Sequence, residues 1–121
     1  MQKQILALLM TGLVVSGGAW AKSDQALLAE AQKNKVSIAQ AQKMPDETGV
    51  TLTGKIVRQV APQSDDFELR DSSGTIIIDV DDDLWKPLKL KAGDNVRVLG
   101  EVDTHRQKPT DIDVISIEKV K

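Results

Sequence analysis

Apolar and polar residues alternate along the chain from residue 50 onward, which is the pattern of strands with one buried face. Turn-forming stretches such as residues 71–74 and 91–94 separate the successive runs. We therefore predict five strands. Their apolar positions are Val50, Leu52, Ile56 and Val60; Phe67 and Leu69; Ile76, Ile78 and Val80; Val96, Val98 and Val102; and Ile112, Val114, Ile115 and Ile117.

Irregular positions within these strands indicate a strongly coiled sheet. Gly54 interrupts the first strand, where it suggests a bulge or a sharp coil, and Gly100 interrupts the fourth. Glycines at such places suit a small barrel that must bend to close. Val57 breaks the alternation in the first strand, and the doubled apolar pair Val114 and Ile115 predicts a bulge in the fifth.

The order of the elements predicts the fold. A short capped turn or helix at residues 82–87 separates the third strand from the fourth, which is the layout of an OB-fold. We therefore predict an all-β class: a small five-stranded OB-fold barrel over residues 47–121, preceded by a short N-terminal helical segment over residues 22–46.

Residues 22–46 favour helix because they are rich in Ala, Gln and Lys, and no Gly or Pro precedes Pro45. Ser23 is a plausible cap for a first helix, and Ser37 for a second, short one. Met44 and Pro45 end the pattern. The pattern leaves open whether this is one kinked helix or two pieces. Since its apolar stripe is thin, we expect the first piece to be frayed or to act as a spacer.

Residues 1–21 have the three parts of a secretory signal peptide: a charged start with Lys3, an apolar run over residues 5–15, and the small-x-small site that ends at Ala21. The alternatives are a membrane anchor or a buried helix, but the run is shorter than the roughly 20 residues that span a bilayer. We predict cleavage after Ala21, a periplasmic location and a mature protein without a transmembrane span.

Composition narrows the function classes. The whole chain has a formal charge of −2, and removal of Lys3 with the signal peptide leaves −3, a poor basis for binding nucleic acid. The chain has no cysteine, which excludes disulfides, thiol chemistry and cysteine metal sites. Phe67 and Trp85 are the only aromatic residues after residue 21, which leaves few rings on which a base or a sugar could stack. We find no nucleophile–base pair, so we predict no enzymatic activity and no cofactor.

Four stretches of the sequence resemble one known family: VTLTGKIVRQV, FELRDSSGTIIIDVDDDLW, AGDNVRVLGEVD and DIDVISIEKV. Together they are similar to the bacterial OB-fold (BOF) family of YgiW/YdeI-type stress-tolerance proteins. The resemblance covers residues 50–120 and also fits the short helix at residues 37–43. It implies small exported proteins of Gram-negative bacteria, with a five-stranded OB barrel behind an N-terminal helix and a role in tolerance of envelope, oxidative or metal stress.

Several residues are candidates for binding an envelope component, such as a peptidoglycan fragment or the periplasmic loop of an inner-membrane protein. The outer face of the first three strands is where OB modules usually bind extended ligands, and the loop between the fourth and fifth strands helps to line that face. An exposed polar loop without a ligand is the alternative. The candidates are Lys55, Arg70, Ile77, His105 and Arg106.

A second hypothesis is weak cation binding by outward-facing carboxylates. Asp79 and Asp81 lie on the outer face of the third strand, and Asp111 and Asp113 lie on that of the fifth, which the OB topology places beside it. The alternative is a solvated face, with Asp82 or Asp83 capping the next turn. We do not predict a metal site at the single histidine, since no carboxylate is its neighbour in sequence.

Trp85 has two interpretations. As a ligand platform it would stack on a sugar or a peptide. As a structural residue, Leu84 and Trp85 would plug the open end of the barrel, because a Trp side chain buries about 150–250 Å². We favour the plug, since a barrel with few large residues needs one.

Overall fold

The computed structural model describes residues 22–121; the predicted signal peptide lies outside the described residues. The chain forms three helices and five strands within this range. In chain order they are α2 (Asp24–Lys33), α3 (Ile38–Ala41), β1 (Gly49–Gln59), β2 (Asp66–Asp71), β3 (Gly74–Asp79), α4 (Asp82–Leu88), β4 (Asn95–Asp103) and β5 (Asp111–Lys119).

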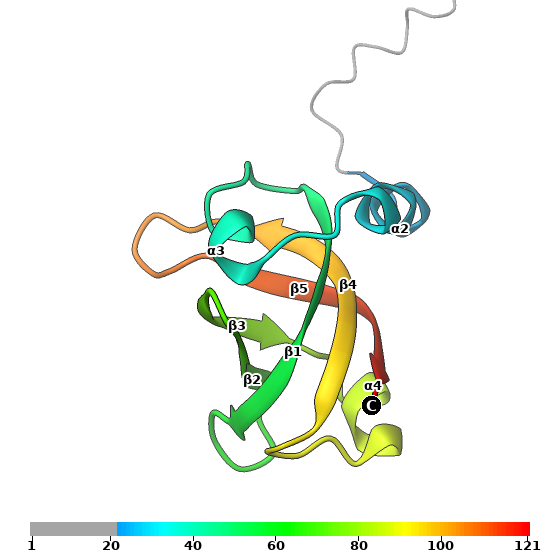
Figure 1. Ribbon diagram of the computed structural model, residues 1–121, viewed down its shortest axis with the longest axis vertical. Helices are drawn as coiled ribbons and strands as arrows, with labels where there is room; N and C mark the ends of the chain where they lie inside the picture. Colours follow the sequence, from blue (N-terminus) through cyan, green and yellow to red (C-terminus); the bar gives the residue numbers. More distant parts are fainter. Residues whose placement is uncertain (1–21) are drawn as a thin grey trace, which may run out of the picture.

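The five strands form one sheet that closes on itself in the order β1-β2-β3-β5-β4 (Figure 1). All neighbouring pairs are antiparallel except β3 and β5, which run parallel. The predicted five strands and the helical element between β3 and β4 are confirmed. The all-β class describes the barrel only, because α2 and α3 precede it and α4 follows β3.

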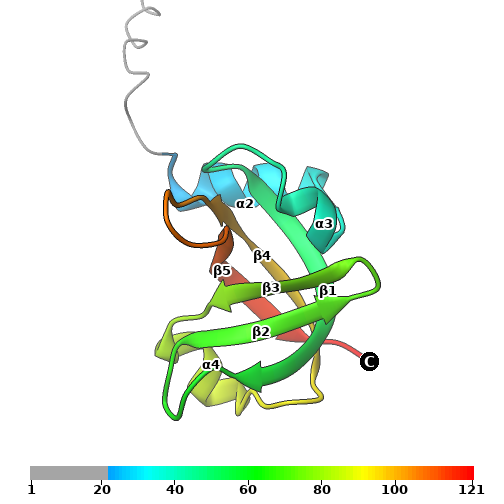
Figure 2. The same ribbon diagram turned by 90° about the vertical axis from the view of Figure 1, so that its left-hand side faces the viewer.

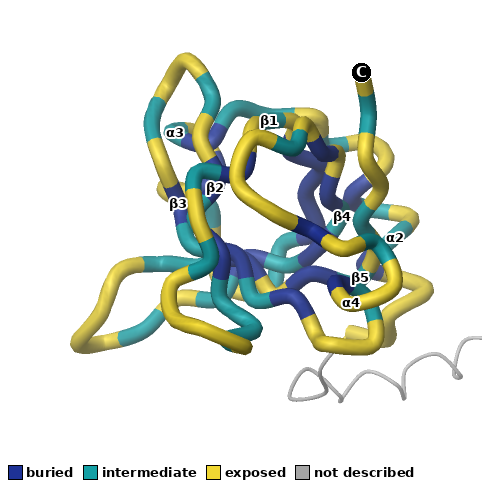
Figure 3. Tube along the Cα trace, turned by 90° about the horizontal axis from the view of Figure 1, so that it is seen from below, coloured by how far each residue is buried: buried dark blue, intermediate teal, exposed yellow. Residues whose placement is uncertain are grey.

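The barrel interior is filled by the inward positions of the alternating pattern. Buried residues appear in Figure 3 as dark blue segments along the strands. Phe67, Leu69 and Ile78 are completely buried. Each fully buried Val, Leu, Ile or Phe side chain contributes about 1.5–3 kcal/mol relative to an exposed one. The predicted core positions are therefore confirmed along most of the barrel.

A bulge in β1 corrects the predicted pattern. In β1, Ile56 pairs with Leu69 and Arg58 with Glu68, so Val57 is the extra residue. An extra residue reverses the two faces of a strand. Val60 was predicted to face inward, and this is wrong: it lies after the bulge and is 39% exposed. The bulge suggested at Gly54 is thus found at Val57.

In β5 the predicted bulge is confirmed. Gly100 pairs with Val114 and Leu99 with Ser116, which leaves Ile115 as the extra residue. Ile117 is thereby returned to the inner face. A Cβ atom on Gly100 would lie 2.4 Å from the carbonyl oxygen of Asp113, so only glycine allows β4 and β5 to approach this closely.

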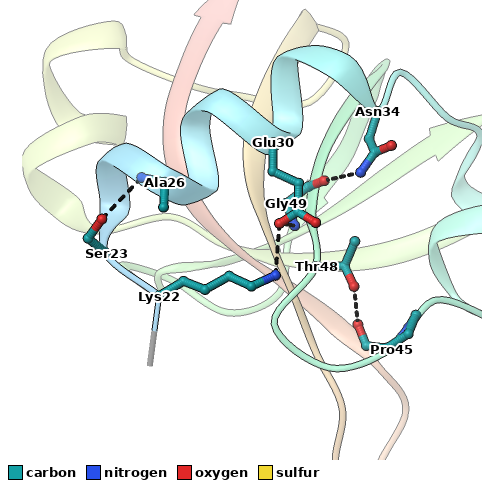
Figure 4. Close-up of polar contacts among 8 residues, drawn as sticks. All are labelled: Lys22, Ser23, Ala26, Glu30, Asn34, Pro45, Thr48 and Gly49. Carbon is teal, nitrogen blue, oxygen red and sulfur yellow. Dashed lines mark hydrogen bonds and ion pairs between the residues drawn. The ribbon is translucent and has the colours of Figure 1, made fainter. Parts of the chain in front are cut away.

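Helix α2 is docked on β1 and β4 (Figures 1 and 4). Two residues of the helix, Leu27 and Ala31, are buried. Gly49 donates its backbone N–H to Glu30 Oε1 at 3.0 Å and accepts from Asn34 Nδ2 at 2.9 Å. The expectation of a frayed helix or spacer is therefore wrong. The short amphipathic pattern is sufficient because hydrogen bonds to the first residue of β1 supplement it.

Two helices, not one kinked helix, precede the barrel. Ser23 caps α2 by accepting from the N–H of Ala26 at 3.1 Å. Ser37 and Gln40 form a capping box at the start of α3. Both predicted caps are confirmed. No helix in the described range of residues has both the length and the apolar character that a membrane span requires.

Trp85 closes one end of the barrel, as predicted. Its side chain is 9% exposed, and its ring meets that of Phe67 edge-on with centroids 5.8 Å apart. Its indole Nε1 donates to Asp65 Oδ1 at 2.8 Å. The N-cap of α4 is Asp81, whose side chain makes no capping hydrogen bond. Asp82 lies in the first turn with Asp83, so the prediction that one of them caps the helix is wrong.

Candidate functional site

A groove lies on the outer face of β2 and β3. Figure 2 shows these strands crossing the front of the molecule, with α3 above one end and the β4–β5 loop above the other. The groove has a volume of about 330 Å³. Its lining residues come from the C-cap of α3, from β2 and β3, from the β4–β5 loop and from the first residue of β5: Gln42, Asp66, Glu68, Thr75, Ile76, Ile77, Lys108, Pro109, Thr110 and Asp111.

Helix α3 is fixed to the sheet at its wall of the groove. The N–H of Ile38 donates to Asp71 Oδ2 at 3.0 Å, and the N–H of Ala39 donates to Ser73 Oγ at 2.9 Å. At the other end of the helix, Gln42 Nε2 donates to the carbonyl oxygen of Thr75 at 2.9 Å. This wall is therefore built before any ligand arrives, which lowers the ordering cost of binding.

The groove combines an apolar base with a charged rim. Ile77 and Pro109 supply apolar surface, while Glu68 and Asp111 supply negative charge and Lys108 a positive charge. Glu68 also forms an ion pair with Arg58 Nε at 2.9 Å, on the side that faces β1. The arrangement suits an extended ligand with apolar parts and hydrogen-bonding groups.

The predicted ligand residues are only partly brought together. Ile77 lines the groove. Lys55 and Arg70 are paired neighbours on the same outer face, and Arg70 pairs with Thr75 of the groove, but neither of the two basic residues lines it.

The two predicted residues of the β4–β5 loop, His105 and Arg106, do not line the groove. His105 is directed to Asp111, and Arg106 is exposed outside the groove lining. Lys108, three residues after His105, is the basic loop residue that reaches the groove. No local signal in the sequence indicates which residue of this loop faces β3.

Carboxylates form a continuous row across four strands, and Asp66 at one end of the row also lines the groove. Asp66 of β2 pairs with Asp79 of β3, Asp79 with Asp113 of β5, and Asp113 with Glu101 of β4. We call these four residues the acidic row. Like charges directly opposite one another are destabilising. Binding of a cation or a proton to the row would therefore stabilise the folded protein.

The electrostatics of the row follow from this geometry. Partial burial, reinforced by the carboxylates of Asp66 and Asp113, raises the pKa of Asp79 to about 6. Partial burial and the charge of Asp113 raise the pKa of Glu101. The pKa of Asp113 is raised by partial burial and by neighbouring carboxylates, of which Asp103 has the largest effect. Three of the four residues thus hold their protons more tightly than isolated carboxyl groups.

The four predicted cation ligands fall into different groups. Asp79 and Asp113 are adjacent in the row, as predicted from the strand order. Asp79 and Asp81 offer oxygens close to Asp65, within 4.8 Å of one another. Asp111 belongs instead with a histidine on the β4–β5 loop.

Glu101 and Asp66 complete the row but were not predicted as ligands. Each lies in a strand whose local pattern looks like a solvated outer face. The register between strands decides that they lie beside Asp113 and Asp79, and no local signal in the sequence gives this register.

The surroundings of His105 differ from those predicted. We expected no neighbouring carboxylate, but His105 Nε2 lies 3.2 Å from Asp111 Oδ1 and 3.7 Å from Asp103 Oδ2. The β4–β5 hairpin pairs Asp103 with Asp111, and this pairing brings both carboxylates to the imidazole.

Comparison with known proteins adds the family. Residues 16–119 match the family described as "Bacterial OB fold (BOF) protein". An uncharacterized protein of Haemophilus influenzae is 30% identical over 86 residues, which span 71% of this chain and 69% of the relative. Protein YgiW of Escherichia coli K12 is 38% identical over 85 residues, which span 69% of this chain and 62% of YgiW. The calcium-regulated OB-fold protein CarO of Pseudomonas aeruginosa is 33% identical over 76 residues, with 63% of each chain covered.

The structural comparison agrees. The solved structure of YgiW from Escherichia coli matches with a TM-score of 0.64 and 34% identity, over 72% of this chain and 90% of that one. An asparaginyl-tRNA synthetase from Pyrococcus horikoshii matches with a TM-score of 0.58 over 23% of its length, and at 20% identity it shows the shared fold alone. The description of the matched family does not mention an enzymatic activity. The chain belongs to the bacterial OB-fold (BOF) family, as its sequence motifs had indicated.

Proposed function

We propose that this protein is an exported, periplasmic binding module that holds a component of the cell envelope in the β2–β3 groove and thereby contributes to envelope stress tolerance. The observation that carries the proposal is the position of the groove. It lies between the outer face of β2 and β3 and the β4–β5 loop, which is the surface that OB-folds use for extended ligands.

The chemistry of the groove favours a peptide-bearing ligand. Its apolar base at Ile77 and Pro109 suits aliphatic or sugar-ring surface. The carboxylates of Asp66, Glu68 and Asp111 on its rim favour ammonium and amide groups over phosphates. A peptidoglycan fragment, with its peptide stem, offers both kinds of group. The periplasmic loop of an inner-membrane protein is the alternative occupant.

The test is co-sedimentation of the processed protein with purified sacculi. We expect Ile77→Glu and Lys108→Glu each to reduce the bound fraction at least fivefold. The first removes the apolar base, and the second removes the ammonium group that can pair with a carboxylate of the peptide stem. Lys33→Glu is the matched control, since Lys33 is exposed on α2, away from the groove. If the folded Ile77→Glu and Lys108→Glu variants sediment with sacculi as well as Lys33→Glu and the unaltered protein do, the groove is not the binding site.

A second candidate function is binding of a hard divalent cation by the acidic row. It is supported by the four carboxylates aligned across β2, β3, β5 and β4. The name of the relative CarO describes that protein as calcium-regulated. Oxygen-only ligand sets suit Ca²⁺. Calorimetry with Ca²⁺ tests this function: we expect heat of binding that is lost in Asp79→Asn and Asp113→Asn, and absence of heat at millimolar Ca²⁺ would remove the hypothesis.

A further inference from the structure

Three side chains with metal-ligating atoms converge at the base of the β4–β5 loop. Asp103 ends β4, Asp111 begins β5, and His105 lies on the loop between them. His105 Nε2 is 3.2 Å from Asp111 Oδ1 and 3.7 Å from Asp103 Oδ2. This loop-base triad is distinct from the acidic row, which contains only carboxylates.

The separations match the first coordination shell of a small divalent metal. Zn²⁺ binds imidazole nitrogen and carboxylate oxygen at about 2.0–2.2 Å, which places neighbouring ligand atoms of a tetrahedral site roughly 3.3–3.6 Å apart. The two distances at His105 are close to this range. Little movement of the side chains is therefore needed for all three to reach one ion.

The triad is held from both sides. The backbones of Asp103 and Asp111 pair within the β4–β5 ladder. The next residue, Thr104, donates its N–H to Asp46 Oδ1 at 2.8 Å, and this bond fixes the start of the loop to the segment before β1. Ligands that rest on paired strands lose little conformational entropy when a metal binds.

The burial is also suitable for a metal site. The side chains of Asp111 and His105 are 16% and 23% exposed, whereas that of Asp103 is 46% exposed. Two donors are thus shielded from water while the third faces solvent. A metal held here has three protein ligands and keeps a coordination position open to water or to a further ligand.

We propose that Asp103, His105 and Asp111 form a binding site for a divalent metal of the Zn²⁺ class. The imidazole nitrogen selects this class, because Ca²⁺ and Mg²⁺ take oxygen ligands whereas imidazole suits Zn²⁺, Cu²⁺, Co²⁺ and Ni²⁺. The competing explanation is that His105 and Asp111 only form a hydrogen bond that closes the loop. The two explanations differ in whether metal affinity depends on the imidazole.

The experiment uses the processed protein without a histidine tag, with Co²⁺ as the spectroscopic probe. We expect visible ligand-field absorption on addition of Co²⁺ and its loss when Zn²⁺ is added. His105→Gln and Asp111→Asn are each expected to weaken Zn²⁺ binding about tenfold or more, since removal of even an outer-shell partner has an effect of this size. Circular dichroism checks that both variants are folded.

The matched control is Glu118→Gln, which removes a carboxylate from the other end of the same strand, where the side chain is 60% exposed. We expect it to leave Zn²⁺ affinity unchanged within about twofold. Zn²⁺ binding that is equally strong in His105→Gln, or no binding at millimolar Zn²⁺ or Co²⁺, would overturn the proposal. Loss of binding in Asp113→Asn with retention in His105→Gln would assign the metal to the acidic row and would also overturn it.

Discussion

Asp79 and Asp113 lie directly opposite each other on the parallel strands β3 and β5. Each has a second carboxylate on its other side, Asp66 and Glu101 respectively. Four carboxylates thus lie side by side across the sheet, with no basic residue among them. In the described residues the row is extended by further acids, since Asp81 and Asp83 share a hollow with Asp113 and Glu101. The protein maintains this repulsion in its folded state, and two of our predictions depend on it.

The first prediction concerns the pH dependence of stability. The pKa of Asp79 is raised to about 6 in the folded protein from its ordinary value of 3.8. The folded state therefore binds more protons than the unfolded state between about pH 4 and pH 6, and stability falls as pH rises through this window. Asp79→Asn removes the charge and is expected to stabilise the protein at pH 7 by about 1–2 kcal/mol, after allowance for partial exposure.

Urea unfolding at several pH values measures the effect of Asp79→Asn. The gain should shrink towards zero below pH 4, where Asp79 is neutral in both states. Asp82→Asn is the control, because this exposed residue lies in the first turn of α4 but does not line the hollow with Asp113 and Glu101. Its effect should stay within about 0.5 kcal/mol. A stabilisation by Asp79→Asn that does not vary between pH 4 and pH 7 contradicts the explanation.

The second prediction concerns calcium and its removal. A cation that binds only the folded state stabilises it by about 2.7 kcal/mol when its free concentration is 100 times its dissociation constant. If the acidic row binds Ca²⁺, the midpoint of thermal unfolding should rise with Ca²⁺ and return to its starting value with a chelator. Asp113→Asn should abolish the rise, whereas His105→Gln should leave it intact. An equal rise of the unfolding midpoint with Ca²⁺ in both variants would show that the acidic row is not the Ca²⁺ site.

The third prediction concerns the plug of the barrel. Trp85→Ala removes a large buried side chain and should cost about 3–5 kcal/mol. Trp85→Phe keeps an aromatic ring near Phe67 but leaves Asp65 without its indole donor. We expect a smaller loss of about 1–3 kcal/mol. Chemical denaturation compares the three proteins, and similar losses in Phe and Ala variants would mean that packing of the ring matters less than the hydrogen bond.

The fourth prediction concerns the docking of α2. A Cβ atom on Gly49 would lie 2.4 Å from the carbonyl oxygen of Leu27 and 3.0 Å from the backbone nitrogen of Ala31. Gly49→Ala must therefore push α2 from β1, and we expect a loss of about 1–3 kcal/mol. Hydrogen exchange should show reduced protection of the amides of α2.

The control for this docking is Lys22→Ala. Lys22 pairs with Glu30 at 3.0 Å, and its side chain is well exposed. An exposed pair of this kind contributes about 0–1 kcal/mol. Protection of α2 that falls as much in Lys22→Ala as in Gly49→Ala would mean that the helix is held by the ion pair and not by its close contact with Gly49.

Local patterns predicted much of the fold because their physical causes are local. The period-two alternation around Phe67 and Ile78 requires only that one face of a strand be buried. The caps at Ser23 and Ser37 depend on hydrogen bonds within three residues. The doubled apolar pair at Val114 and Ile115 carried its own signal for a bulge. Val60 was misplaced because the bulge before it arises from pairing with β2, which alternation alone does not reveal.

The candidate sites were less predictable because they depend on contacts between distant segments. The sequence by itself determined the strand pattern, the helix caps, the family motifs and the supply of carboxylates, since each is set by neighbouring residues or by composition. Only the tertiary structure decided that Asp79 meets Asp113, that Lys108 reaches the groove, and that His105 has carboxylates beside it. The register between β3 and β5 and the course of the β4–β5 loop fix these contacts. Both arise when the barrel closes.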